Sequence, residues 1–245
     1  ASGTSIVAGG LGSNAGNETR RGLLKFDLST LPAGSVVTRV ELQLQVVMVP
    51  LSPPDSIFEV RRVLVPWQEN QATWNTRLSQ IPWNAPGALN PSDTAQPASS
   101  SVVVSGLGTY TIPSSPQLVA DVQGWLDNPA GNHGWLLRSQ SENVLRTARH
   151  FASREALDPA TRPRLRVTYV TRPLLAGVER EGDGVAFEFS AEAGVSYRIE
   201  TRTSLVTGNW ELRRRVGPLA ETRMERAVEP LPTGSQSLFV RVVAE

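Results

Sequence analysis

Apolar and polar residues alternate along most of the chain with a period of two, as in β-strands that have one face in a hydrophobic core. The longest example covers residues 37–49 and places five apolar side chains on one face, at Val40, Leu42, Leu44, Val46 and Met48. This pattern predicts a half-buried strand. Shorter runs of the same kind predict further strands at residues 56–65, 101–105, 108–112, 134–139 and 163–169.

One segment departs from this alternation and predicts a helix over residues 115–127. Ser115 suits the N-cap, and Pro116 suits the first helical position. Apolar residues then recur at helical spacing and form one stripe, at Leu118, Val122, Trp125 and Leu126. The dipeptide Asn128-Pro129 predicts the end of the helix.

Two β-sandwich domains are the expectation for a chain of 245 residues. We place residues 1–171, with the helix, in the first domain and residues 172–245 in the second. In the second part, the sequence EGDG at residues 181–184 predicts a hairpin turn between alternating runs. Several short strands in so few residues are typical of a small immunoglobulin-like or fibronectin-like sandwich. The predicted fold class is therefore all-β.

Composition excludes several classes of function. The net charge of +1 gives no global field that would attract nucleic acid or an anionic membrane. The absence of cysteine excludes a disulfide scaffold and a thiolate zinc site. No apolar run approaches the roughly 20 residues of a membrane helix. The chain starts without a signal peptide, which fits a mature or trimmed secreted protein. We expect an extracellular or cell-surface protein without nucleic-acid partners or membrane insertion.

The sequence offers little equipment for catalysis. Its two histidines, His133 and His150, belong to no H-E-x-x-H motif, and no G-x-S-x-G elbow is present. The carboxylates are scattered and do not point to a glycosidase. We therefore predict that the protein is not an enzyme, with a polysaccharide lyase as a distant third hypothesis. We expect no cofactor; a structural calcium ion is conceivable at residues 13–18 or 127–132, but ordinary turns are the favoured interpretation.

Tryptophan and arginine supply the candidate ligand-binding residues. Residues 66–100 predict a long loop that contains Trp67, Trp74 and Trp83. We interpret the first two as structural and Trp83 as the better candidate for an exposed ring that stacks on sugars. Near the predicted strand ends, fork-shaped donors for an acidic polysaccharide are present at Arg20, Arg21, Arg61 and Arg62. Solvent-facing arginine is the commoner role of such residues. The arginine run at 213–215 is less suggestive, because glutamates nearby could neutralise it.

Five segments of the first part occur in a characteristic order: RRGLLKFDLSTLPAGSVVTRVELQL, VLVPWQENQATWNT, LVADVQGWLDNPAGNHGWLLRS, FASRE and RPRLRVTY. At these spacings, residues 20–170 resemble the DNRLRE or disaggregatase-related family, which is similar to alginate-associated carbohydrate-binding modules. The resemblance implies a β-jelly-roll on secreted bacterial proteins. The segment YRIETRTSLVTGNWELRRRV is similar to a small sandwich domain at the end of such proteins. The predicted function is a carbohydrate-binding or adhesive surface module, for an acidic polysaccharide.

An alternative prediction follows from one departure from that family. Relatives have a further strand before the segment equivalent to residues 5–10, and here only ASGT precedes it. We predict an inner strand at residues 20–28 whose neighbour is missing, which leaves an edge that invites pairing with another chain. The alternative function is thus a structural subunit of a filament or surface layer, with neighbouring copies as partners and residues 1–10 or 238–245 as the donated strand. A trimmed chain explains the departure equally well.

Overall fold

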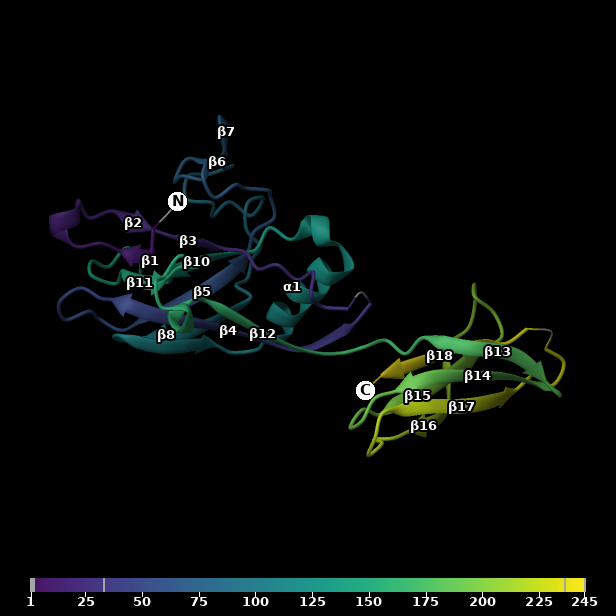
Figure 1. Cartoon of the computed structure of the whole chain (residues 1–245). Helices are drawn as coiled ribbons and strands as arrows, with labels where there is room; N and C mark the ends of the chain where they lie inside the picture. Colours follow the sequence, from purple (N-terminus) through teal and green to yellow (C-terminus); the bar gives the residue numbers. More distant parts are fainter. Residues whose placement is uncertain (1–2, 33, 236, 245) are drawn as a thin grey trace. The chain divides into compact units, whose positions relative to one another are not determined.

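A computed structural model describes residues 3–32, 34–235 and 237–244 (Figure 1). The chain divides into two compact units, residues 1–33 with 37–169 and residues 34–36 with 170–245. Both are built from antiparallel strands, and the described residues contain one α-helix, α1 (Pro116–Asp127). The all-β sandwich class predicted from the alternation is confirmed.

The first unit has two main sheets whose side chains meet in one hydrophobic core. One sheet has the order β12-β4-β11-β1-β2, with β9 also paired to β4, and the other has the order β3-β10-β5-β8. The strands of the first sheet are β1 (Ser5–Gly10), β2 (Thr19–Arg20), β4 (Val36–Met48), β9 (Gly108–Ile112), β11 (Arg149–Ala152) and β12 (Arg164–Val170). Those of the second are β3 (Gly22–Leu24), β5 (Ser56–Arg62), β8 (Ser100–Val104) and β10 (Trp135–Ser139).

Strand β4 follows the predicted alternation along most of its length. Val40, Leu42, Leu44 and Val46 are buried, whereas Met48 is 57% exposed. The prediction that Met48 faces the core is therefore wrong. The residue ends the strand beside a register shift between His150 and Phe151 of β11, so the alternation no longer continues into the core.

Helix α1 begins and ends where the sequence predicts. The Oγ of Ser115 accepts a hydrogen bond from the amide of Leu118 at 3.0 Å, and Asn128 forms the C-cap. Leu118, Val122 and Trp125 are buried in the core of the first unit. The ring of Trp125 packs edge-to-face on that of Trp135, with centroids 4.5 Å apart. The helix therefore belongs to the core and not to the periphery.

The long connection between β5 and β8 covers the outer face of the second sheet. It contains the short strands β6 (Thr76–Leu78) and β7 (Ile81–Pro82), and its side chains form a second apolar cluster with the sheet, at Val63, Trp83, Ala88 and Leu136. The expectation that Trp83 is exposed is wrong, because its side chain is 5% exposed and its Nε1 donates to the Thr73 carbonyl at 3.0 Å. Trp83 fixes the loop, while Trp74 is 39% exposed.

Residues 22–24 form an edge strand, which corrects the prediction of an inner strand. The sequence predicts an inner strand because β3 has apolar residues on both faces, and both faces are covered. Leu24 enters the main core, and Leu23 packs against the apolar cluster under the long loop. A strand that is covered on both faces has the sequence pattern of an inner strand even when its outer edge has no partner.

A fully buried arginine closes one end of the first unit. Arg149 is 0% exposed, and its guanidinium donates to backbone carbonyls of three separate segments. The accepting oxygens belong to Pro54 (2.7 Å), Val104 (3.3 Å), Ser105 (2.8 Å), Arg146 (3.3 Å), Thr147 (2.9 Å) and Ala148 (3.2 Å). One side chain thus satisfies carbonyls that strand pairing leaves free at this end.

The second unit consists of two three-stranded sheets, β13-β14-β17 and β16-β15-β18. Its strands are β13 (Leu175–Glu181), β14 (Gly184–Ala191), β15 (Tyr197–Arg202), β16 (Glu211–Val216), β17 (Arg223–Pro230) and β18 (Phe239–Ala244). Phe187, Phe189, Tyr197 and Ile199 lie in its core. The predicted EGDG turn joins β13 to β14, with Glu181 opposite Gly184. Among the described residues, no helix is long and apolar enough to cross a membrane.

The position of Trp125 in the core generates a stability prediction. Replacing Trp125 with alanine should lower the free energy of unfolding by about 3 to 5 kcal/mol, because the change removes a large buried ring and leaves a cavity. The matched control is Leu51→Ala, since Leu51 is 86% exposed. Urea unfolding followed by circular dichroism measures both. A loss below about 1 kcal/mol for Trp125→Ala would show that the helix is peripheral.

Candidate functional site

A groove opens on the side of the first unit, between the outer edges of its two sheets. Its volume is about 1190 Å³, and it is lined by Gly3, Ser5 and Ile6 on one side and by residues 20–29 on the other. Trp125 and Leu126 of α1 and Trp67, Trp74 and Trp83 of the long loop also line it. The groove therefore runs beside the stretch for which the sequence predicts an unpaired edge.

The hydrogen bonds of neighbouring residues show which backbone groups face this groove. Val63 N donates to Gly134 O, and Gln140 N donates to Ile57 O. The N–H and C=O groups of the even-numbered residues of β10 therefore point toward β5. Trp135 and Leu137 therefore bond to β3, where they pair with Leu24 and Gly22. The N–H and C=O groups of Leu23 and Lys25 consequently point away from β10, toward the groove. Within the part of the chain that the structure describes, no group bonds to them.

Strand β1 also has main-chain groups that point away from its partner strand. The amide of Ser153 donates to the Thr4 carbonyl at 3.0 Å, and Ser5 pairs with Ala152. Since bonding alternates along an antiparallel pair, the main-chain groups of Ser5 and Val7 point away from β11. Strand β2 pairs with β1 only at Gly9 and Gly10. Two sheet edges without a strand partner thus stand on either side of one groove.

Half-buried apolar side chains line the groove between these edges. They belong to the periphery of the main core and are Ile6, Phe26, Leu28 and Leu126. Trp125 is 4% exposed, and its Nε1 has no hydrogen-bond partner among the residues that the structure describes. Buried donors without a partner are rare in folded proteins. The groove therefore combines unpaired backbone with uncovered core.

Charged side chains form the rim of the groove. Arg154 is exposed and pairs with Glu69 at 2.7 Å and with Glu155 at 2.5 Å. Arg20 is exposed and pairs with Glu18. Lys25 is exposed and has no ion pair among the described residues. Among the described residues of the rim, Lys25 is therefore a cation without a paired carboxylate.

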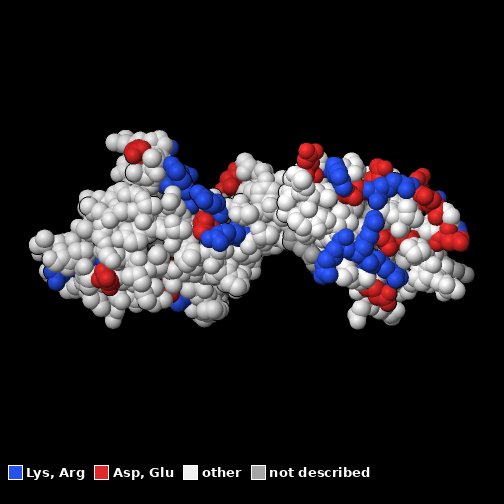
Figure 2. All heavy atoms as spheres, turned by 90° about the horizontal axis from the view of Figure 1, so that it is seen from below, with Lys and Arg blue, Asp and Glu red and all other residues white. Residues whose placement is uncertain are grey.

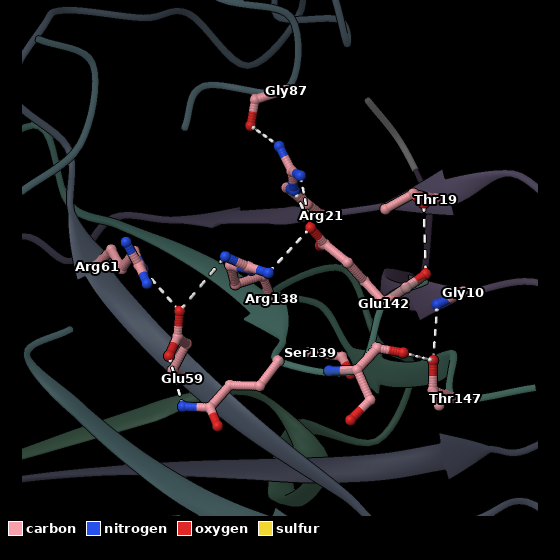
Figure 3. A network of polar contacts seen from close by, with 12 residues as sticks. Gly10, Thr19, Arg21, Glu59, Arg61, Gly87, Arg138, Ser139, Glu142 and Thr147 are labelled. Carbon is pink, nitrogen blue, oxygen red and sulfur yellow. Dashed lines mark hydrogen bonds and ion pairs between the residues drawn. The ribbon is translucent and has the colours of Figure 1, made fainter. Parts of the chain in front are cut away.

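Two of the four predicted arginines of the first unit belong to one polar network (Figure 3). Arg21 makes a bidentate pair with Glu142, at 3.0 and 2.6 Å, and donates to the Gly87 carbonyl at 2.5 Å. Arg138 lies between the two carboxylates, 3.0 Å from Glu142 and 3.7 Å from Glu59. Glu59 in turn accepts from Arg61 at 2.6 Å. Figure 3 shows these side chains following one another across the outer face of the sheet.

Two arginines that we predicted to bind a ligand are instead paired with glutamates of this network. The side chains of Arg21 and Arg61 are 10% and 15% exposed, and each is held by a carboxylate. Arg62 points to the opposite face, where its Nε lies 3.4 Å from the buried Asp121. Arg20 does not join the network. Arg138 and both glutamates were not among the predicted site residues, although Glu59 and Arg61 alternate on one strand face.

A second group of charges lies on the outer face of sheet β16-β15-β18. Because Tyr197 and Ile199 enter the core, the alternate residues of β15 face outward. These are Arg198, Glu200 and Arg202. Their strand neighbours on this face include Arg215, opposite Arg198, and Arg241, opposite Glu200. We call these five residues, together with Trp210, the arginine face; none of them was among the predicted site residues.

Within the arginine face, two guanidinium groups lie over one tryptophan ring. The Cζ atoms of Arg202 and Arg241 are 4.5 and 4.4 Å from the centroid of Trp210. Glu200 is 5% exposed and binds Arg241 at 2.6 Å. Arg202 has no ion pair within the described residues, and its Nε has no hydrogen-bond partner. Figure 2 shows how charged side chains crowd the second unit, whereas the first unit is largely uncharged on the side shown.

Both histidines are half-buried. Burial lowers the pKa of His133, and the charges of Lys25 and Arg77 lower it further. Burial also lowers the pKa of His150, whose Nδ1 lies 3.3 Å from the Ser5 hydroxyl. Among the described residues, no group of three or more histidines and carboxylates could hold a metal ion. The stretches considered for calcium form the 3₁₀ turns at Ser13–Ala15 and Pro129–Gly131.

No protein-family model matches the chain, and no curated protein matches it either. The resemblance to the DNRLRE family therefore stays a prediction.

The polar network generates a stability prediction. Glu142→Gln should lower the free energy of unfolding by about 2 to 4 kcal/mol, because it leaves Arg21 and Arg138 mostly buried without a full counter-charge. Arg20→Gln should cost less than about 1 kcal/mol, since its pair with Glu18 is exposed. Denaturant unfolding measures both. Equal and small losses would mean that the network adds nothing to stability.

The histidines generate a prediction about pH. Each has a pKa below the ordinary 6.5 in the folded chain. As the pH falls below about 6.5, the unfolded chain binds protons that the folded chain does not bind, so stability falls. In the double variant His133→Gln and His150→Gln, this loss between about pH 7 and pH 5 should be smaller. Thermal unfolding across this range measures it, and an unchanged slope would contradict the assignment.

Proposed function

We propose that the protein is a non-catalytic binding or adhesive module of an extracellular or cell-surface protein, and that it holds an acidic polysaccharide on the arginine face. The observation that carries this proposal is the pair Arg202 and Arg241 over Trp210, beside Arg198 and Arg215. Guanidinium groups donate in a fork that matches carboxylate and sulfate oxygens. Here four such groups share one sheet face with one buried carboxylate.

The spacing of the arginine face supports a chain-like ligand. Residues 198 and 202 are four positions apart on β15, which corresponds to roughly 13 Å, and neighbouring strands add about 5 Å on each side. Positive charge is thus spread along a line that several consecutive anionic groups can follow. Glu200 pairs with Arg198 and Arg241, but the side chains of these two arginines remain 36% and 45% exposed. In the first unit, the side chains of Arg21, Arg61 and Arg138 also bind carboxylates and are only 10% to 15% exposed.

The contacts of the Trp210 ring favour a polysaccharide over a nucleic acid as the ligand. Single-stranded nucleic acids are bound by aromatic rings on which bases stack. The ring of Trp210 already carries two guanidinium groups. The face therefore offers charge and hydrogen-bond donors without a free stacking platform.

Binding of the full chain to alginate tests this proposal. We expect affinity to fall as salt rises from about 50 to about 500 mM, because exposed charge pairs are screened. The double variant Arg202→Gln and Arg241→Gln should lower affinity at least about ten-fold, the loss of roughly 1.4 kcal/mol. Calorimetry or surface plasmon resonance measures it.

Two control variants make the result specific. Arg223→Gln removes an exposed arginine from the other sheet of the second unit, and Arg61→Gln removes a predicted site residue from the first. Both should leave alginate affinity unchanged. Loss of binding in Arg61→Gln with full binding in the double variant would move the site back to the first unit. Salt-insensitive binding, or none, would contradict the proposal.

A further inference from the structure

The groove of the first unit has a structure that the proposed polysaccharide binding does not use. It is bordered by two open sheet edges, one at Leu23 of β3 and Lys25 directly after it, and the other at Ser5–Val7 of β1. Between them lie apolar side chains that belong to the rim of the hydrophobic core. Edge strands with unpaired N–H and C=O groups are templates for a further strand.

We propose that this groove accepts an extended strand from another polypeptide chain. The unpaired main-chain groups of Leu23 and Lys25 are two residues apart on one edge, which is the repeat with which an added strand bonds. The apolar lining calls for apolar side chains at every second position of that strand. Its other side chains face the rim, where Lys25 favours an acidic residue.

The apolar lining distinguishes a polypeptide from a sugar as the occupant. A sugar ring carries hydroxyl groups that lose their hydrogen bonds against Phe26, Leu28 and Leu126. An inserted strand covers these side chains with its own apolar residues, while its backbone bonds to the open edges.

The structure also limits the source of the strand. The segments expected to be donated by a neighbouring copy are residues 1–10 and 238–245. Within the described residues, Ser5–Gly10 pairs with β11 and β2 of its own unit, and Phe239–Ala244 pairs with β15. Donation of either strand by a neighbouring copy would first have to break an existing sheet. The occupant is a different chain, and the groove itself remains open beside residues 22–28.

Synthetic peptides test this proposal on the full chain. The probe is a ten-residue peptide in which valine and threonine alternate, flanked by aspartate residues. Its matched control has the same composition, with the valines and threonines in two separate blocks. We expect the alternating peptide to bind at least about ten-fold more tightly in calorimetry, because only it presents one apolar face. Equal binding of the two, or none, would overturn the proposal.

Variants of the groove locate the binding. Lys25→Pro removes the outward N–H and should abolish peptide binding, whereas Lys25→Ala removes only the charge and should retain most of it. Leu28→Asp places a charge in the groove and should also abolish binding, with Leu157→Asp, at a residue that is 92% exposed, as its control. Circular dichroism confirms that each variant is folded.

Two further outcomes would contradict the proposal. Competition between alginate and the alternating peptide would show that the groove holds a glycan. Filaments of the purified chain that Lys25→Pro prevents would show that a second copy supplies the strand. Loss of alginate binding through Arg202→Gln and Arg241→Gln leaves the peptide result unchanged, so the two proposals fail independently.

Discussion

The first unit depends on one backbone constraint, which is that a strand can pair with only one sheet at a time. Arg20 pairs with Gly9 in one sheet, and Gly22 already pairs with Leu137 in the other. The chain therefore crosses from one sheet to the other at Arg21, the single residue between them. Gly22 permits this, because a Cβ there would lie 2.4 Å from Ile6 Cγ2. Beyond the crossing the two edges separate, and the space between them is the groove.

Charge is used differently in the two units. In the first, Arg21, Arg61 and Arg138 alternate with two glutamates and hold the sheet to the long loop above it. Removing one partner of such a pair is costly, because the other charge is then left buried without compensation. In the second, Arg202 and Arg241 lie over Trp210, and Arg241 also pairs with Glu200. The same residue type therefore has a structural role in one unit and a proposed binding role in the other.

Local patterns predicted the elements well and their partners poorly. The Ser115 cap, the apolar stripe of α1 and the alternation in β4 depend on neighbours in sequence, so they could be predicted. The exposure of Trp83 depends on a loop that folds back over the sheet. The partners of Arg21 and Arg149 lie 121 and up to 95 residues away, so no local pattern reveals them. The arginine face was missed because its members come from three separate strands.

The central claim is that two sheet edges of the first unit have no partner, and amide hydrogen exchange of the unassembled full chain tests it most directly. Residue-resolved exchange measured by nuclear magnetic resonance should show fast exchange at Leu23 and Lys25 and slow exchange at Gly22 and Leu24, which bond to β10. On β1, Ser5 and Val7 should exchange faster than Ile6 and Ala8. Equal protection of neighbouring residues on either edge would mean that the edge is already paired and would contradict the account.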